Sequence, residues 1–489
     1  MQENAKEKGM PLMTFKKALI GLLIPLAVML PMVLSGVDLL LAYFSAAFFL
    51  IIYGLILGFK WDGLSKDMIK GGAGMLEAAI IIALVGGLIG VWIISGTVPA
   101  MIYYGLKIIS PKLFVPLSFL ICIITSLATG SSWGTAGTVG VALFGIASGM
   151  GIPLPLTVGA LISGSILGDK LSPLSDTTLL ASASTNTNIF DHVVSMLYTT
   201  VPLAILSLIL YAILGFKYGS AALDTAQISI LINGLSESFH LGVITLLPVV
   251  LVLVLSFKRL PPMAVFGITI VASMVLAVFY QGAEWKDVFS VTVNGFSSST
   301  GIEGLDNLLS RGGILSMMSI TMLSILAGSL AGLMDHMSIL KIFIGHASRG
   351  VHSPAGMVTL TTCVCTGMSI AACDQYLILT LPGIAFRPSY DKMNIHSSVL
   401  SRTMEDTGTV FGSINPWHFT STFFVGTFGV PVLSYAPFAF FPLLSPLMAI
   451  LNAWLGIGLF RCNDTIKYRP FWKRPKDSKT TSTGVQVKT

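Results

Sequence analysis

The chain has 489 residues, of which 54% are hydrophobic and only 10% are charged, and its formal net charge is +6. Soluble globular chains carry about 25% charged residues. The composition therefore excludes a water-soluble enzyme, a nucleic-acid-binding protein and a disordered chain, and it predicts an all-α polytopic membrane protein in contact with lipid.

Basic residues gather at both ends of the chain, beside apolar segments. Lys16 and Lys17 open the first apolar run, and Lys473 follows the last one. Cytoplasmic ends of membrane segments carry such an excess of Lys and Arg. We therefore expect residues 1–15 and 461–489 to be cytoplasmic tails of a multi-pass protein in the plasma membrane.

Apolar runs along the chain predict membrane-spanning helices. Crossing the hydrocarbon takes about 20 apolar residues, and several of the runs are shorter or are cut by Gly, Pro or polar residues. We expect about 11 to 13 true spans, while the remaining runs form broken or re-entrant helices lined by protein or water. The candidate runs are residues 16–36, 38–59, 74–96, 113–130, 134–150, 153–168, 193–216, 239–257, 261–281, 313–334, 338–348, 354–371, 375–386, 410–429 and 431–460.

The order of features predicts an internal duplication. The run 86–90 resembles 328–332, Thr125–Gly130 resembles Thr366–Ala371, and a polar acidic stretch follows each. The interval is about 240 residues. We expect two inverted repeats, as in many secondary transporters. The expected divisions are N-terminal transmembrane helices over 16–70, repeat 1 over 71–217, a linker with transmembrane helices over 218–311, and repeat 2 over 312–460.

The densest polar group at apparent membrane depth is Gly168–Thr178. Ionisable side chains at that depth cost about 2.5–3.5 kcal/mol each on insertion scales, so they indicate function. Pro173 removes an amide donor and disfavours helix at Ser172, so the backbone is expected to unwind and free its carbonyls. Carbonyl, hydroxyl and carboxylate oxygens are the ligands that hard cations prefer. The alternative is a polar interfacial loop whose Asp169 and Asp176 cap the next helix.

A second polar group, Arg402–Thr409, has similar chemistry, with adjacent carboxylates at Glu405 and Asp406, hydroxyls and a glycine. The alternative is an exposed loop in which Glu405 pairs with Arg402 at helical spacing. Asp374, which lies between two apolar runs, is a third candidate, and its alternative is a helix N-cap.

The sequence holds no GxxxxGK[ST] nucleotide loop and no HExxH or His/Cys metal spacing. An ATP-driven pump and an enzyme are therefore not indicated, and no cofactor is expected. The energy source is then an ion gradient or the gradient of the substrate. Glu77 lies in an apolar segment, either as a buried proton carrier or at the cytoplasmic end of its helix.

Several segments match the motifs of a known transporter family. They are Gly168–Thr178, Ser132–Thr135, Asp374–Tyr376, Arg402–Thr409 and Pro416–Trp417. Through them, residues 75–445 resemble the NhaC family of sodium/proton antiporters, within a broader ion-transporter superfamily. The resemblance implies two repeats whose broken helices meet near the membrane midplane and move in an elevator-like way. Such folds often pair, so a homodimer is one implication.

The second polar group departs from the family pattern. The pattern continues with a Ser-Pro pair and then Pro-Trp-Asn, whereas here Gly412 or Ser413 stands for a Pro and His418 for an Asn. This segment is expected to face the substrate, so the departure bears on the cargo more than on the fold. The family also contains exchangers of malate and lactate. The alternative function is therefore sodium-coupled exchange of small organic acids or amino acids.

The expected mechanism is competition between Na+ and H+, the transported ions, for a carboxylate near the midplane. Burial disfavours the charged carboxylate, so a proton stays bound until Na+ stabilises the charge and expels it. An organic anion would instead be held by the two basic partners of the site. The expected site comprises Asp169 and Asp176 as first candidates for Na+, Asp374, Glu405 and Asp406 as further acids, Ser172, Ser175, Thr177, Thr409, Ser413 and Asn415 as neutral oxygens, and Lys170 and Arg402 as charge partners.

Overall fold

The computed structural model describes residues 11, 13–219, 225–258, 260–347, 350–371, 375–464 and 466–467. Within these residues the secondary structure is helical, apart from a single antiparallel bridge between Ile395 and Arg461. The expectation of an all-α architecture is confirmed.

Eight helices in the described part of the chain are long and apolar enough to cross a membrane, or ten if each of two bent pairs counts as one span. The number of such helices is smaller than the expected number of spans, which was about 11 to 13. The reason is that α10 (Leu154–Leu171) and α21 (Gln375–Lys392) reach 18 residues but carry polar and charged side chains. The apolar helices are α2 (Phe15–Leu34), α3 (Leu39–Ile56), α5 (Leu76–Ile94), α7 (Pro111–Thr129), α12 (Ile189–Gly219), α15 (Pro262–Phe279), α18 (Met318–His336, preceded by the 3-10 turn η3, Ile314–Met317) and α20 (Pro354–Ala371).

Many of the other runs are broken, as their Gly and Pro content predicts. The helices of one bent pair, Phe419–Phe428 and Val432–Phe438, meet at 87°, and those of the other, Ser229–Ser238 and Val243–Ser256, meet at 93°. The remaining elements are α4 (Trp61–Gly74), α6 (Thr97–Ile108), α8 (Ser132–Thr135), the π-helix η1 (Ala136–Gly140), α9 (Val141–Gly149), α11 (Asp176–Ser184), α13 (Thr225–Ser238), η2 (Val243–Leu246), α14 (Leu247–Phe257), α16 (Trp285–Asn294), α17 (Glu303–Leu309), α19 (Ile339–Ala347), α22 (Ser397–Met404), the π-helix η5 (Glu405–Thr409), α23 (Phe419–Phe428), α24 (Val432–Tyr435), η6 (Ala436–Phe438) and α25 (Phe440–Trp454).

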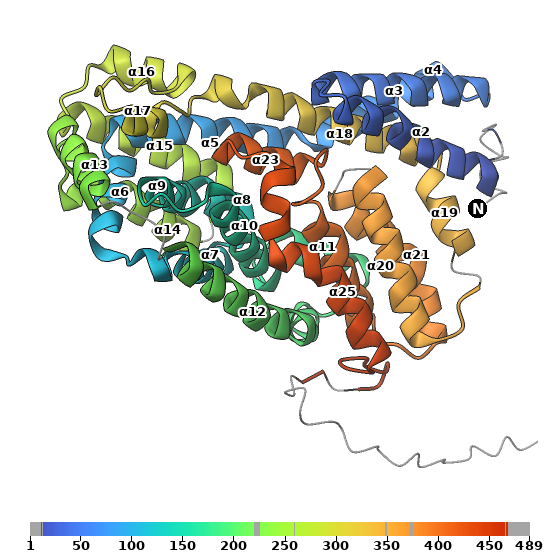
Figure 1. The fold of residues 1–489 in the computed structure, drawn as a ribbon. Coiled ribbons are helices and arrows are strands. Elements are labelled where there is room, and N and C mark those ends of the chain that lie inside the picture. Colours follow the sequence, from blue (N-terminus) through green and yellow to red (C-terminus); the bar gives the residue numbers. More distant parts are fainter. Residues whose placement is uncertain are drawn as a thin grey trace, which may run out of the picture.

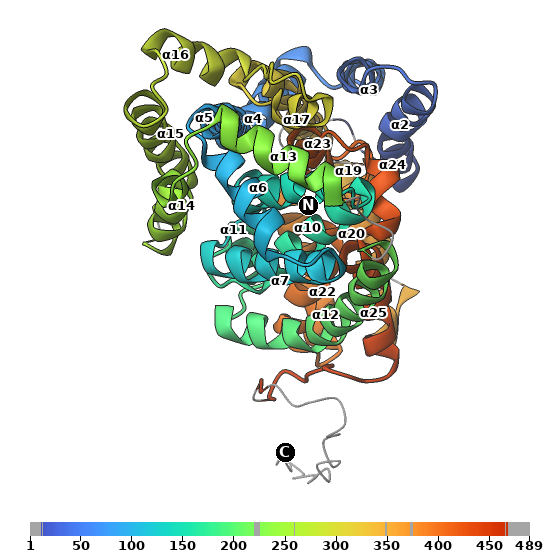
Figure 2. The ribbon, with the colours of Figure 1, turned by 60° about the vertical axis from the view of Figure 1, so that its left-hand side comes forward.

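The helices surround a central group formed by α8, α10, α11 and α23 (Figure 1). Helices α2, α3 and α4 lie at one end of the molecule, and α13, α14 and α15 lie at the other. Figure 2 shows α12 and α25 together along the edge opposite α16 and α17. The break between α10 and α11, which carries the first polar motif, lies in this central group (Figure 1).

Buried side chains form two apolar cores. The first includes Trp92 of α5 and Phe119 of α7, and the second includes Tyr43 of α3 and Phe386 of α21. Trp133, just after the turn that ends α7, packs against both cores. The polar motifs therefore lie where the two cores meet.

Two close helix contacts repeat across the chain. A Cβ atom on Gly71 would lie 2.2 Å from the Gly328 carbonyl oxygen, and one on Gly86 would lie 2.5 Å from the Gly313 carbonyl oxygen. Gly313 follows Gly71, and Gly328 follows Gly86, by the same number of positions. The two contacts are therefore reciprocal, as a two-fold relation between halves predicts. The proposed boundaries of the repeats stay a prediction.

Candidate functional site

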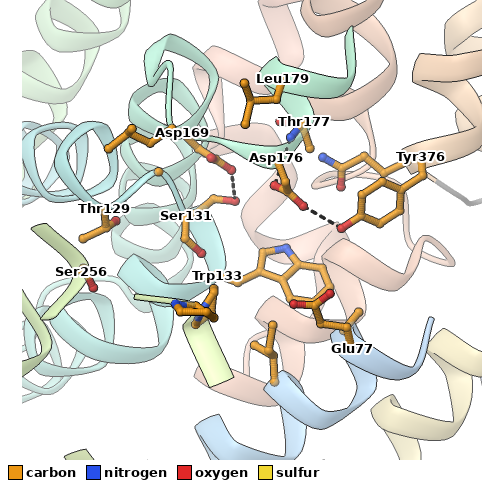
Figure 3. Close-up of a pocket in the computed structure, with 18 of the residues that line it drawn as sticks. Glu77, Thr129, Ser131, Trp133, Asp169, Asp176, Thr177, Leu179, Ser256 and Tyr376 are labelled. Carbon is orange, nitrogen blue, oxygen red and sulfur yellow. Dashed lines mark hydrogen bonds between the residues drawn. The ribbon is translucent and has the colours of Figure 1, made fainter. Parts of the chain in front are cut away.

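A cavity of about 590 Å³ opens at the junction of the two cores (Figure 3). Its walls come from the turn after α7, the break between α10 and α11, the start of α21, the start of α5 and the loop between α14 and α15. The polar and aromatic side chains that line it are Glu77, Thr129, Ser131, Ser132, Trp133, Asp169, Asp176, Thr177, Ser256, Gln375, Tyr376 and Phe419.

A tight turn joins α7 to α8 and brings its polar residues to the cavity. Gly130 ends α7 with a φ of 68°, a left-handed conformation that suits glycine, and a Cβ there would lie 2.9 Å from the Leu174 backbone. Ser131 then caps α8, because its hydroxyl oxygen accepts the Gly134 amide at 3.0 Å. The turn thereby places Ser132 and Trp133 in the wall of the cavity.

The backbone unwinds between α10 and α11, as the sequence predicted. α10 ends at Leu171, the next residues are extended or in a turn around Pro173, and α11 begins at Asp176. The Ser172 hydroxyl oxygen accepts the Leu174 amide at 3.3 Å. The Thr178 hydroxyl donates to the carbonyl of Lys170 at 3.1 Å, which ties the two helix ends together.

Asp169 is the buried acid of the cavity. It is only 8% exposed, and its Oδ2 accepts the hydroxyl of Ser132 at 2.7 Å. Its Oδ1 accepts no hydrogen bond of normal geometry from the described residues. Buried carboxylate oxygens are rarely left without a partner. Asp169 therefore has one coordination position to offer to a cation, a proton or a water molecule.

Asp176 lines the same cavity from the start of α11, but it is exposed. Its Oδ2 accepts the Tyr376 hydroxyl at 2.7 Å, and its Oδ1 accepts the Thr177 amide at 3.0 Å. Figure 3 shows the carboxylates of Asp169 and Asp176 pointing into the same space. Both acids of the first motif therefore line the cavity, but Asp169 is buried and Asp176 is exposed.

A second, interior acid cluster lies behind the cavity. Lys170 forms an ion pair with Asp406, and these side chains are 2% and 0% exposed. The same Asp406 oxygen accepts the hydroxyl of Thr199 on α12 at 2.9 Å. Glu405 is 1% exposed, and its Oε2 accepts the Thr409 hydroxyl at 2.9 Å. Both acids lie in the π-helix η5, and such bulges are frequent at functional sites.

The interior acid cluster and the cavity are electrostatically connected. Lys170, Thr177 and Asp169 all act on the Glu405 carboxylate, and two of these three line the cavity. The structure therefore brings the two polar motifs together, one from each half of the chain. Buried oxygens of Glu405 and Asp406 also lack hydrogen bonds from the described residues.

Arg402 is buried at 1% exposure, which rules out the exposed loop considered for this motif. Its Nη1 donates to the carbonyls of Ser195 at 3.3 Å and Gly458 at 3.0 Å, and Asp406 is its main electrostatic partner. Glu405 forms no ion pair with it among the described residues.

Some residues of the expected site lie elsewhere. The Ser413 hydroxyl donates to the carbonyl of Val410 at 2.8 Å, and the Asn415 amide donates to the carbonyl of Ser369 at 3.0 Å. Neither residue lines the cavity. Ser175, by contrast, stays next to the site, because its hydroxyl lies 3.0 Å from that of Thr177 and also acts on the Asp169 carboxylate. Asp374 falls outside the described residues.

Other residues of the site were not singled out from the sequence as ligands. Ser132 bonds directly to Asp169, and Tyr376 bonds directly to Asp176. Thr199 is one of several buried polar residues on a largely apolar helix, with Ser195 one turn and His192 two turns before it. That helical spacing is the signal that could have identified Thr199.

Among the described residues, no three His, Cys, Asp or Glu side chains converge as a metal-binding set. A bound cation would therefore take its ligands from a mixture of carboxylate, hydroxyl and carbonyl oxygens. Such a mixture suits a hard cation.

Comparison with known proteins identifies the family of the chain. The model described as the Na+/H+ antiporter family matches residues 10–193 and 167–457. The chain belongs to the Na+/H+ antiporter family. The resemblance to NhaC proteins is thereby confirmed, and this antiporter-family chain is a multi-pass membrane protein of a transporter family.

Similar proteins are named for different cargoes. The Na(+)/H(+) antiporter NhaC of Alkalihalophilus pseudofirmus is 39% identical over 83% of this chain and 88% of its own. The malate-2H(+)/Na(+)-lactate antiporter of Bacillus subtilis is 36% identical over 92% and 97%. The arginine/ornithine antiporter ArcD of Halobacterium salinarum is 35% identical over 82% and 84%. Because these identities are so close, the cargo has to be argued from the site itself.

Proposed function

We propose that this antiporter-family chain exchanges Na+ for H+ across the plasma membrane, with Asp169 as the carboxylate that holds either ion. The observation that carries the proposal is the buried Asp169 carboxylate at the cavity wall, with one oxygen held by Ser132 and the other unpartnered among the described residues. The cavity that Asp169 lines is large enough for a hydrated ion.

Charge balance favours a single monovalent ion at this place. The described side chains of the connected buried group are three acids, Asp169, Glu405 and Asp406, and two bases, Lys170 and Arg402. When all are ionised, one negative charge is left over. An uncompensated buried charge is strongly disfavoured. One Na+ or one H+ neutralises the group, and both together would overcompensate it.

The exchange follows from that balance. Na+ enters the cavity past the exposed Asp176, loses part of its hydration shell and gains the Asp169 carboxylate with nearby hydroxyl and carbonyl oxygens. Its arrival stabilises the charged carboxylate, so the proton leaves. If one repeat moved with both ions bound, or with neither, it would carry a net charge into the membrane interior. That cost opposes uncoupled transport.

The movement itself is assigned to the two expected repeats, residues 71–217 and 312–460. Their broken segments meet at the Lys170–Asp406 ion pair, which joins the first polar motif to the second. We place both termini in the cytoplasm on the basis of the positive-inside rule. No catalytic step and no cofactor are needed.

An organic anion is disfavoured as cargo. Lys170 and Arg402 were the residues expected to hold its carboxylate, but Lys170 is paired with Asp406 and Arg402 is bonded to backbone carbonyls. Neither lines the cavity, and its described ionisable lining residues are all acids. Sodium/proton exchange is therefore favoured over malate/lactate exchange.

The test is a transport assay with purified protein in liposomes that hold a pH gradient. We expect addition of Na+ to drive proton flux through the wild type and through Asp287→Asn, a control at an exposed acid of α16. Asp169→Asn is expected to abolish the flux, and Asp176→Asn to weaken it. Normal sodium-dependent proton flux through Asp169→Asn would overturn the proposal.

A further inference from the structure

Two hydroxyl groups lie between the buried acid of the cavity and a buried acid of the interior cluster. The Ser175 hydroxyl acts on the Asp169 carboxylate, and the Thr177 hydroxyl acts on the Glu405 carboxylate, each by hydrogen bonding. The two hydroxyl oxygens are 3.0 Å apart, which is within hydrogen-bonding distance. We call these four residues the hydroxyl relay, because they connect an acid in one half of the chain to an acid in the other.

The hydroxyl relay is buried and is built around the break between α10 and α11. Asp169 belongs to the last turn of α10, Ser175 immediately precedes α11, and Thr177 is in the first turn of α11. Thr177 also lines the cavity. The relay therefore runs from the cavity wall into the interior, through the segment that Pro173 unwinds.

The Ser175 hydroxyl does not perform the structural task that its position offers. Ser175 occupies the N-cap position of α11, where a serine hydroxyl usually accepts a backbone amide of the first turn. Here it makes no capping hydrogen bond, and it acts instead on the Thr177 hydroxyl and the Asp169 carboxylate. The two helix ends are tied together by Thr178. A role in the site therefore accounts for the Ser175 hydroxyl better than a role in helix capping.

The chemistry of the hydroxyl relay suits the passage of a proton. A hydroxyl group donates one hydrogen and accepts another, so it takes a proton on one side while it gives one on the other. At the two ends, Asp169 Oδ1 and Glu405 Oε1 accept no hydrogen bond of normal geometry from the described residues. Each acid therefore keeps an oxygen that can carry the proton. Chains of buried acids form the proton relays of many transporters.

We propose that the hydroxyl relay moves the transported proton between Asp169 and Glu405, so that Glu405 is a second place at which this proton is held. In this step the Asp169 carboxyl gives its proton to the Ser175 oxygen, and Ser175 gives its own proton to Thr177. Thr177 then gives its proton to the Glu405 carboxylate. Asp169 ends as a carboxylate, Glu405 ends as a carboxylic acid, and both hydroxyl groups are restored. The inference rests on the proposed function, which supplies the proton.

The second place prepares the site for sodium. When the proton is on Glu405, Asp169 is ionised, while the charge of the buried group as a whole is still balanced. Na+ therefore meets a charged ligand, and its arrival leaves one positive charge in excess, which expels the proton. Because Thr177 lines the cavity, the proton has a way out that does not pass through the carboxylate that holds Na+.

The test is an infrared difference spectrum of the purified full-length protein with and without Na+, in samples that carry heavy carbon in the side-chain carboxyl of either aspartate or glutamate. We expect Na+ to remove the carbonyl band of a protonated carboxyl group, and we expect each label to shift a part of that band. Glu405→Asp keeps the charge of the buried group, so this variant is expected to lose the glutamate part of the band and to keep the aspartate part.

The hydroxyl link is tested by Thr177→Val, which keeps the shape of the side chain and removes the hydroxyl, with Thr177→Ser as the conservative variant. After rapid mixing with Na+, the glutamate part of the band should disappear at least about tenfold more slowly in Thr177→Val than in the wild type. Thr177→Ser should restore the rate. The matched control is Thr157→Val, at a buried threonine of α10 whose hydroxyl donates to the carbonyl of Pro153 at 3.3 Å, and it should keep the wild-type rate.

The outcomes separate this inference from the proposed function. If only the aspartate label shifts the band, the proton does not reach Glu405, so the inference is wrong and sodium/proton exchange at Asp169 stands. Equal rates in Thr177→Val and the wild type would remove the two hydroxyl groups from the path and overturn the inference. If Na+ changes no carboxyl band, or changes one that only the glutamate label shifts, Asp169 carries no exchangeable proton and the proposed function is wrong.

Discussion

Asp169 and Lys170 are consecutive residues at the end of α10, but they belong to two regions with different chemistry. Asp169 faces a cavity of about 590 Å³ and keeps one oxygen without a hydrogen bond from the described chain. Lys170 faces the interior, where it is paired with Asp406. Successive residues on a helix point about 100° apart, so one helix end supplies both the proposed ion site and a buried ion pair. An acid in a polar motif can therefore line the cavity, as Asp169 does, or be held in a buried ion pair, as Asp406 is, so the number of acids does not give the number of ion sites.

The largest effect is expected from removing the buried Lys170–Asp406 ion pair. Lys170→Met leaves Asp406 as an unpaired buried charge, so we expect a loss of about 3–5 kcal/mol in the free energy of unfolding. Unfolding of the purified protein in detergent, followed against temperature and denaturant, measures this loss. The double variant Lys170→Met with Asp406→Leu is expected to recover most of it.

A surface ion pair provides the control for that prediction. Lys341 and Asp335 are 2.9 Å apart, and their side chains are 43% and 47% exposed. Lys341→Met is therefore expected to change the free energy of unfolding by less than about 1 kcal/mol. Equal losses for Lys341→Met and Lys170→Met would contradict the difference drawn between the buried pair and the surface.

On the cavity side, the variant Ser132→Ala tests the contribution of the Ser132 hydroxyl to Na+ binding at Asp169. This variant removes the hydroxyl that donates to Asp169 at 2.7 Å. Hydrogen bonds to charged groups contribute about 1.5–3 kcal/mol, so the affinity for Na+ should fall at least about tenfold. Equilibrium binding of radioactive Na+ measures the change, with Ser299→Ala at an exposed loop as control. An unchanged affinity would remove Ser132 from the site.

A smaller effect is expected from the turn that carries Ser132. Gly130→Ala forces an alanine into the left-handed region, which costs about 1–2 kcal/mol, and its Cβ would meet the Leu174 backbone. We expect a lower melting temperature and a weaker affinity for Na+. Gly74→Ala, where a Cβ would have no neighbour within 4 Å, is the control and should lower neither quantity.

The smallest effect lies outside the membrane-spanning helices, at Asp306. The Ser298 hydroxyl, with the amide and hydroxyl of Thr300, lowers the pKa of this carboxyl to about 2. A lowered pKa stabilises the folded state above the unfolded value of about 3.9, and that stability is lost as the pH falls toward 2. Asp306→Asn should therefore have a smaller drop in melting temperature between pH 4 and 2 than the wild type. Identical drops would contradict this reading of the loop.

The broken helix at Pro173 and the convergence of the two motifs could be predicted from the sequence. Pro173 breaks α10 from α11 through its own covalent geometry, and a repeat with charged residues in both halves implies a shared site. The all-helical class followed from composition, and the membership of the antiporter family from short motifs.

The positions of Ser413 and Asn415 could not be predicted in the same way. Both residues lie in the irregular segment 412–418, between the end of the helix that contains η5 and the start of α23, where no helical periodicity fixes the direction of a side chain. Their side chains bond to nearby carbonyls and not to the cavity. Tyr376 reaches Asp176 from a segment 200 positions away, and such a contact leaves no local pattern.

The most direct test of the central claim is the number of protons released when purified protein binds Na+ in weakly buffered solution. For one carboxylate shared by two ions, the wild type should release a proton for each Na+ bound, and its Na+ affinity should fall about tenfold per pH unit once the site is protonated. Asp169→Asn should bind Na+ weakly and release none. Sodium binding by the wild type without proton release, or proton release at the wild-type ratio from Asp169→Asn, would contradict the account.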